Sequence, residues 1–382
     1  MNFSKNLFTL FFGLLFLTLT PPIQSASPET GQQQGKLIFA VDLIRHGDRN
    51  PIATIPKAPH TWLGGLGQLT ATGMRQEYLL GKKLRARYID QTKLLPKSYE
   101  PGTIYARASD RDRTFMSAES CLMGLYPPGC GPCVSSNFLM KQAALPCYIQ
   151  PIPIHMVARN QDTLMVPDNN VNCDFDQLVE TNVRSTPAWK QKEAELKPHF
   201  KAWSDATGLT ITRFKQIGFL GDTLYIDQIK HIPFPQGISK KDAEMIMEAE
   251  QWAAVAVYKN PTVGKATGGM LLREIAHYLK EASQGKTPLK YVLYAAHDST
   301  IMSLLSAMGA PLNAFPPYAS DLNISLFSQG NQHYYVQVTL NDKTISLPCS
   351  GSATCSLKEF MDLAASTNGS LQSSPLLSSG PR

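Results

Sequence analysis

A histidine lies between two arginines near the beginning of the chain, in the segment Leu43-Ile44-Arg45-His46-Gly47-Asp48-Arg49-Asn50-Pro51. A neutral imidazole can attack phosphorus and carry a phosphoryl group, and guanidinium groups pair with the oxygens over which a phosphoryl transition state spreads its charge. The pattern therefore predicts a phosphate site in which His46 is the nucleophile and Arg45 and Arg49 hold the phosphoryl oxygens. For the tripeptide Arg-His-Gly alone, an ordinary polar turn after a strand is the alternative.

The longer pattern is more specific than the tripeptide. Arg45-His46-Gly47-x-Arg49-x-Pro51 resembles the signature of the histidine acid phosphatases, the secreted branch of the histidine phosphatase superfamily. Three further motifs follow in the order of that family: Gly67-Gln68-Leu69-Thr70 with Gly73, Ser109-Asp110-Arg111-Asp112-Arg113-Thr114, and His297-Asp298 after the apolar run 291–296. The resemblance spans roughly residues 36–362, and the segment Pro317-Tyr318-Ala319-Ser320 resembles the acid phosphatases of animal type.

The resemblance implies a role for each polar residue of the motifs. His46 would form a phosphohistidine, and Asp298 would protonate the leaving oxygen and then help to activate water. The phosphate-binding residues would be Arg45, Arg49, Arg113 and His297. This chemistry uses neither a metal ion nor a cofactor, and we expect none.

Asp298 and a further arginine, Arg107, have alternatives outside catalysis. Taken alone, Asp298 could be the N-cap of a helix over residues 299–308. Arg107 is either a further phosphate ligand or a structural ion-pair partner near Asp110 or Asp112, and we favour the structural role.

The predicted site favours acid conditions. Neighbouring arginines disfavour imidazolium and so lower the pKa of a histidine, which keeps the His46 nucleophile neutral in acid. An aspartate can donate a proton only when it is protonated, and low pH favours that state. We expect activity to peak on the acid side of neutrality, and a rate that rises steadily to pH 8 would contradict this.

Strand ends must bring these motifs together. Residues 36–44 are apolar or β-branched and end in the His46 motif, which predicts a buried parallel strand with polar residues at its carboxyl end, where ligands of open α/β sheets bind. Further strands are expected at 102–106, 151–157 and 290–296. Helices are expected at 69–88, 113–125, 186–203, 210–224, 239–259 and 268–282, with Thr70, Ser109 or Asp110, and Ser239 with Asp242 as caps.

This alternation predicts an α/β fold with a mostly parallel sheet and helices on both faces. The family resemblance adds a phosphoglycerate-mutase-like topology with an inserted, mainly helical cap that walls the site. We expect an α/β catalytic domain over 36–157 and 258–348, the cap over 158–257, and a loose tail over 364–382.

The chain has seven cysteines, an odd number, so at least one is unpaired. The family resemblance implies a disulfide between Cys349 and Cys355. It also implies that one family disulfide is absent, because Asp321 stands where the partner of Cys173 would be. The pairing of the remaining cysteines stays open: Cys121, Cys130, Cys133, Cys147 and Cys173. A zinc site at Cys130-x-x-Cys133 is disfavoured, since no nearby pair of ligands completes it.

The N-terminus predicts export. Lys5 precedes an apolar run over residues 7–19 and small residues near 25–27, the layout of a secretory signal peptide over residues 1–26. Export favours a secreted or periplasmic protein with no stable membrane anchor. The net charge of +6 includes no dense basic block, so we expect small phosphate monoesters as partners rather than nucleic acid, and a homodimer remains open.

Three other functions were compared with an acid phosphatase. A phytase or sugar-phosphate phosphatase of the same family shares the chemistry, but its second motif typically reads His-Asp-Thr-Asn, whereas here Ser299-Thr300 follow Asp298. Mutases of the superfamily lack the Arg-x-Pro extension and an export signal. An exported protein that binds a phosphate ligand without turnover would leave the complete set of motifs unexplained.

Overall fold

The computed structural model describes residues 35–134, 142–168, 174–349 and 354–367. The predicted signal peptide, Cys173 and most of the predicted tail lie outside these ranges. Among the helices of the described residues, none has the length and apolar character needed to cross a membrane.

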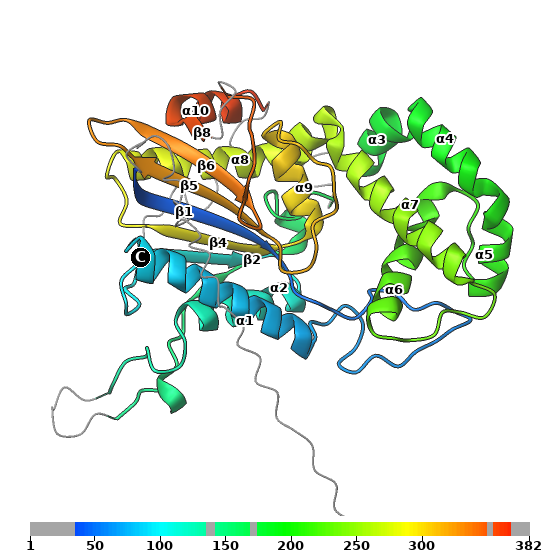
Figure 1. Ribbon diagram of the computed structural model, residues 1–382, viewed down its shortest axis with the longest axis horizontal. Helices are drawn as coiled ribbons and strands as arrows, with labels where there is room; N and C mark the ends of the chain where they lie inside the picture. The colour runs from blue at the N-terminus through cyan, green and yellow to red at the C-terminus, as the bar shows by residue number, and fades with distance from the viewer. Residues whose placement is uncertain (1–34, 135–141, 169–173, 350–353, 368–382) are drawn as a thin grey trace, which may run out of the picture. The chain divides into compact units, whose positions relative to one another are not determined.

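An eight-stranded mixed sheet forms the centre of the described chain, in the order β3-β2-β4-β1-β5-β6-β7 with β8 paired to β6 (Figure 1). Strands β1 to β4 pair in parallel, and β5 to β8 add to this half through antiparallel pairings. The strands are β1 Lys36–Arg45, β2 Ile104–Ala108, β3 Ile154–His155, β4 Tyr291–Ala296, β5 Asp321–Ser328, β6 Tyr334–Leu340, β7 Lys343–Thr344 and β8 Thr354–Ser356.

Helices cover both faces of this sheet. Figure 1 shows α1 (Ala71–Arg85) and α2 (Asp112–Leu125) on one face, and α8 (Pro261–Ser283), α9 (Asp298–Ala307) and α10 (Leu357–Ala365) on the other. Side chains of β1 alternate between the two cores: Phe39, Val41 and Leu43 pack on the α8 side, and Ala40 and Ile44 on the α1 side. This alternation is the period of an extended strand buried on both faces.

A group of helices between β3 and α8 lies beside the sheet (Figure 1). It comprises α3 Phe175–Val179, α4 Pro187–Leu196, α5 Phe200–Thr207, α6 Gly218–Ile229 and α7 Lys240–Lys259. Short π-helical turns lie at Ala86–Gln91 and Glu180–Arg184, and 3-10 turns at Pro146–Tyr148, Arg159–Gln161, Lys197–His199 and Phe214–Ile217. The helical composition matches the expectation for residues 158–257, while the domain boundaries stay a prediction.

The α/β class with helices on both faces is confirmed, but the sheet is mixed rather than mostly parallel. The antiparallel half arises because β5 follows a loop after α9 and runs back along β1, and β6 then returns through a tight turn at Gly330, whose φ is +85°. A short turn joins only antiparallel strands, since a parallel connection needs a long crossover. The parallel half is the part that carries the predicted site.

Two of the three predicted helix caps are confirmed. Thr70 accepts a hydrogen bond from the Gly73 backbone N–H at the start of α1, and Ser239 forms a capping box with Asp242 at the start of α7. The predicted cap of α2 at Ser109 or Asp110 is wrong, because the helix begins at Asp112 with Arg111 as its N-cap. The Ser109 hydroxyl instead bonds to His297 and to the Thr114 hydroxyl of α2, and Asp110 accepts from the Arg159 backbone N–H.

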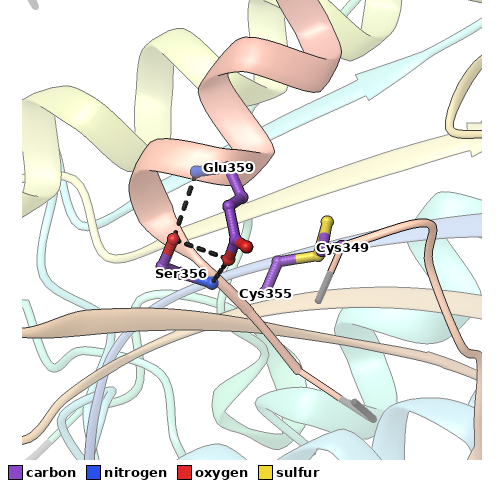
Figure 2. Close-up of a disulfide and its surroundings, with 4 residues drawn as sticks. All are labelled: Cys349, Cys355, Ser356 and Glu359. Carbon is purple, nitrogen blue, oxygen red and sulfur yellow. Dashed lines mark hydrogen bonds between the residues drawn. A yellow bond between two sulfur atoms is a disulfide. The ribbon is translucent and has the colours of Figure 1, made fainter. Parts of the chain in front are cut away.

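The predicted disulfide between Cys349 and Cys355 is confirmed, with Cα atoms 5.4 Å apart (Figure 2). Directly after it, Ser356 and Glu359 form a capping box: the Ser356 backbone N–H and hydroxyl both donate to Glu359, and the Glu359 backbone N–H donates to the Ser356 hydroxyl (Figure 2). The bridge and the cap together fix the entry into α10. Four other described cysteines have free thiols: Cys121, Cys130, Cys133 and Cys147.

Candidate active site

The predicted phosphate-site residues come from three strand ends at one edge of the sheet. β1 and β4 are parallel neighbours, and the last residue of β1, Arg45, is in register with the last residue of β4, Ala296. The residues that follow each strand, His46 and His297, therefore lie side by side, with ring centroids 5.6 Å apart. β2 pairs with β4 on its other side, so the segment after β2 delivers Arg113 to the same place.

All six predicted site residues line one cavity of about 830 Å³: Arg45, His46, Arg49, Arg113, His297 and Asp298. Helices α6, α7 and α9 supply further parts of its wall. Sequence motifs separated by as many as 252 positions of chain thus meet around one space large enough for a small substrate.

His46 is buried, and its ring orientation leaves one nitrogen for chemistry. Its Nδ1 lies 2.9 Å from the backbone oxygen of Gly47. A carbonyl oxygen only accepts, so Nδ1 carries the proton and Nε2 of the neutral ring keeps its lone pair. Burial and the charges of the site arginines, Arg113 first, lower the pKa of His46 well below its ordinary value. The imidazole is therefore neutral and nucleophilic in mild acid.

Arg45 is held by contacts on several sides. Its Nη1 donates to the backbone oxygen of Pro316 at 2.6 Å, and its Nη2 pairs with Asp298 at 2.9 Å. The guanidinium also lies over the ring of Tyr318, 4.3 Å from the centroid. These contacts fix the orientation of Arg45 before any substrate binds.

Arg49 makes a two-pronged ion pair with Asp222 of α6, at 3.0 Å and 2.9 Å. Burial alone would lower the pKa of Arg49, but the charge of Asp222 outweighs it and raises the pKa above its ordinary value. The bidentate geometry suits the planar guanidinium and ties the loop after β1 to the helices beside the sheet.

Arg113 carries the least compensated charge of the three arginines. Burial, together with the charges of Arg49 and Arg111, lowers its pKa to about 10. The Nε–H groups of Arg45, Arg49 and Arg113 are all buried, and none has a hydrogen-bond partner among the described residues. Arg45 and Arg49 each pair with a carboxylate, whereas Arg113 makes no ion pair in the described part of the chain, so its charge is available to an anion in the cavity.

His297 is oriented by Ser109. Its Nε2 lies 2.9 Å from the Ser109 hydroxyl, and its Nδ1 lies 3.5 Å from a terminal nitrogen of Arg113. Burial, then the charges of Arg113 and Arg159, lower the pKa of His297, which keeps the ring neutral. A guanidinium only donates, so Nδ1 accepts from Arg113 and Nε2 carries the ring proton, which it donates to the Ser109 hydroxyl; that hydroxyl donates in turn to Thr114.

Asp298 is the first residue of α9 and is not its N-cap, which is His297. Its Oδ1 accepts a hydrogen bond from the Ser299 backbone N–H at 2.7 Å, and its Oδ2 pairs with Arg45. The alternative reading of Asp298 as an N-cap is therefore wrong, and the helix terminus instead holds this carboxyl at the cavity wall.

Gly47, in the motif of His46, and Gly73, in the second motif, allow these two segments to pack closely. A Cβ atom on Gly47 would lie 2.5 Å from the backbone oxygen of Gly73, so the loop after β1 and the start of α1 touch through their backbones. The Asp48 backbone oxygen accepts from Thr70, and the Asp48 backbone N–H donates to Gln76. The second motif thus supports the loop that carries His46.

Arg107 is outside the cavity and has a structural role, as favoured. Its partner, however, is Asp162, at 2.7 Å in a buried ion pair, and not Asp110 or Asp112. Asp162 also accepts from the backbone N–H groups of Leu164 and Met165, so the pair stabilises the segment after β3.

Sequence reasoning missed several residues of the site. Ser109 was considered only as a helix cap, and Asp222 and Glu250 were not singled out, although both line the cavity. The last two lie on helices far from any motif, so no local pattern marks them. No group of three or more His, Cys, Asp or Glu side chains within the described ranges is placed to hold a metal ion.

Comparisons with known proteins agree on one family. The family model described as "Histidine phosphatase superfamily (branch 2)" matches residues 36–341. The chain is 30% identical to bovine lysosomal acid phosphatase over 344 residues, which cover 87% of this chain and 78% of that protein. It is 31% identical to rat prostatic acid phosphatase over 349 residues, 87% of this chain and 86% of that protein.

Solved structures give the same fold at lower sequence identity. The phytase from Citrobacter braakii superimposes with a TM-score of 0.65 at 17% identity, covering 87% of this chain and 98% of that one. The Klebsiella sp ASR1 phytase gives 0.66 at 16% identity, covering 91% and 100%. At these identities the likeness establishes the fold alone.

Proposed function

Since the chain belongs to branch 2 of the histidine phosphatase superfamily, we propose that it is an acid phosphatase that hydrolyses phosphate monoesters through a phosphohistidine on His46. The observation that carries the proposal is the neutral His46, whose Nε2 keeps its lone pair, in one cavity with Arg45, Arg49 and the carboxylate-free Arg113. The cavity thus contains both a nucleophile and cationic groups that can bind the phosphoryl oxygens.

In the first step, Nε2 of His46 attacks phosphorus while the bond to the leaving oxygen breaks. Asp298, in its protonated form, gives its proton to that oxygen, so the alcohol leaves neutral. Arg45, Arg49, Arg113 and His297 hold the phosphoryl oxygens. In the second step, Asp298 takes a proton from water, the water oxygen attacks phosphorus, the bond to His46 breaks, and phosphate is released.

His297 contributes through its Nδ1, the nitrogen on the Arg113 side. With an anion bound, the tautomer protonated at Nδ1 donates to a phosphoryl oxygen, and Ser109 then donates to Nε2. Ser109 is accordingly a positioning residue, since it acts through His297.

A phytase is the second candidate, and basic groups around the cavity favour it. Arg111, Arg159 and Lys215 also line the cavity and would suit additional phosphates. Arg159 and Lys215 are each paired with a carboxylate, which reduces the charge they offer, so simple monoesters remain the first choice. Turnover of inositol hexakisphosphate compared with aryl and sugar monophosphates separates the two.

The proposal includes export. The apolar N-terminal run supports a signal peptide cleaved near residue 26, and similar proteins include lysosomal acid phosphatases. Secretion or delivery to the periplasm would permit the disulfide between Cys349 and Cys355.

The proposal is tested by hydrolysis of p-nitrophenyl phosphate from acid to neutral pH with EDTA present, using the wild type and His46→Ala. We expect acid-favoured, EDTA-resistant turnover that the variant lacks. An inactive wild type that still binds phosphate would indicate the non-catalytic binding protein, and a fully active variant would rule out His46 as the nucleophile.

A further inference from the structure

Glu250 of α7 is a carboxylic acid in the cavity wall that the proposed mechanism does not use. In the part of the chain that the structure describes, no hydrogen bond or ion pair of its side chain is found, in contrast to Asp222 and Asp298, which pair with arginines. A carboxyl group that is partly buried without a partner is costly when charged.

The packing of α6 against α7 fixes this side chain at the cavity. A Cβ atom on Gly221 would lie 2.5 Å from Cβ and 2.9 Å from Cγ of Glu250. Gly221 therefore leaves the space that the stem of Glu250 fills, and the next residue, Asp222, holds Arg49. One turn of α6 therefore packs against Glu250 through Gly221 and pairs with Arg49 through Asp222, which brings Glu250 and this arginine to the same wall of the cavity.

Four charged groups of the same cavity act on Glu250: Asp222 on α6, Asp298 on α9, Arg45 at the end of β1 and Arg49 in the loop that follows. The tyrosines Tyr225 on α6 and Tyr258 on α7 line the same cavity. Burial, then the charges of Asp222 and Asp298, raise the pKa of Glu250 to about 8 despite the opposite effect of the two arginines.

We propose that Glu250 limits the pH range in which this site binds phosphate: as a neutral acid it admits the phosphate group, and as a carboxylate it repels it. The inference rests on the proposed phosphate site. In acid the cavity then presents its full positive charge to the substrate. At a pH high enough to ionise Glu250, a third carboxylate joins Asp222 and Asp298 and weakens phosphate binding.

The test is the dissociation constant of inorganic phosphate, measured by calorimetry at pH 6 and pH 9 for the wild type, Glu250→Gln and Glu248→Gln. Gln keeps the shape and cannot ionise, and Glu248 is an exposed residue of the same helix that does not line the cavity. The ionisation of phosphate itself is common to all three proteins and cancels when they are compared.

We expect the ratio of the two dissociation constants, pH 9 over pH 6, to be roughly three- to tenfold larger for the wild type than for Glu250→Gln. Glu248→Gln should follow the wild type. Equal ratios for wild type and Glu250→Gln would overturn the inference.

The measurement needs no turnover, so it separates this inference from the proposed function. A wild type that binds phosphate with the expected pH ratio but hydrolyses nothing would overturn the function alone. A wild type that does not bind phosphate at either pH would overturn the inference together with the phosphate site.

Discussion

Asp298 has a proposed role that depends on the leaving group, which separates it from the other residues of the site. In the proposed mechanism, the arginines and His297 bind the phosphoryl oxygens, which are common to all monoesters. Asp298 would act on the oxygen that departs, and the need for its proton depends on how basic that oxygen is. Its contact with Arg45 fixes its position at the cavity wall, and it must gain a proton before it can donate one.

We therefore expect Asp298→Asn to lower kcat/KM by roughly 10²- to 10³-fold for glycerol 2-phosphate, whose alkoxide leaves poorly, and by less than about tenfold for p-nitrophenyl phosphate. Because kcat/KM reports the steps up to formation of phosphohistidine, the later role of Asp298 with water does not enter. Equal losses on both substrates would show that Asp298 does not protonate the leaving group.

At the scale of elements, the active site depends on a backbone contact between the loop after β1 and the start of α1. A Cβ atom on Gly73 would collide with the Asp48 backbone oxygen and lie 2.8 Å from the Asp48 backbone nitrogen. The displaced atoms belong to backbone, so the strain cannot be relieved by turning a side chain.

Gly73→Ala should lower the free energy of unfolding by about 1–3 kcal/mol, measured by urea denaturation, and should reduce activity because the loop that carries His46 shifts. Gly218→Ala is the matched control. Gly218 begins α6, and a Cβ atom there would have no neighbour within 4 Å, so this change should be neutral or slightly stabilising. A Gly73→Ala protein as stable as the control would contradict the close packing described above.

Elements that carry a local signal could be predicted from the sequence, and contacts made between elements could not. The apolar runs that end in Arg45 and Ala296 are visible in the sequence, and so are the caps Thr70 and Ser239. The partner of Arg49 is 173 positions away on a helix without a motif. Ser109 was misassigned because a serine before a helix has the same local appearance whether it caps the helix or bonds to His297.

At the scale of the whole molecule, a second cluster of acids lies in the core between the sheet and α1, away from the active site. Asp42 of β1 accepts hydrogen bonds from Tyr88 and Asn323, both at 2.8 Å. Glu77 of α1 is fully buried, and neither of its carboxyl oxygens has a hydrogen-bond partner among the described residues. Such a group is tolerated in the core only in its neutral form.

The protonation of this cluster links the stability of the whole fold to pH. Burial and the charge of Asp321 raise the pKa of Glu77, and burial and the charge of Asp42 raise the pKa of Asp321. At a pH above the ordinary carboxyl range, which lies near pH 4, these two carboxyl groups therefore hold more protons in the folded protein than in the unfolded chain. This contribution to stability is complete below that range and is lost as pH rises through the raised pKa values.

Glu77→Gln isolates this effect, because the amide cannot ionise and the other titrating groups, including the buried His46 and His297, are the same in both proteins. We expect similar free energies of unfolding for the two proteins at pH 4.5 and a variant more stable by about 1–3 kcal/mol at pH 8. Urea denaturation at both pH values measures the difference. If the free energies of unfolding of the two proteins differ by the same amount at both pH values, Glu77 is charged in the core at both. The stability that the acid cluster contributes at low pH would then have to come from Asp321 and its neighbours.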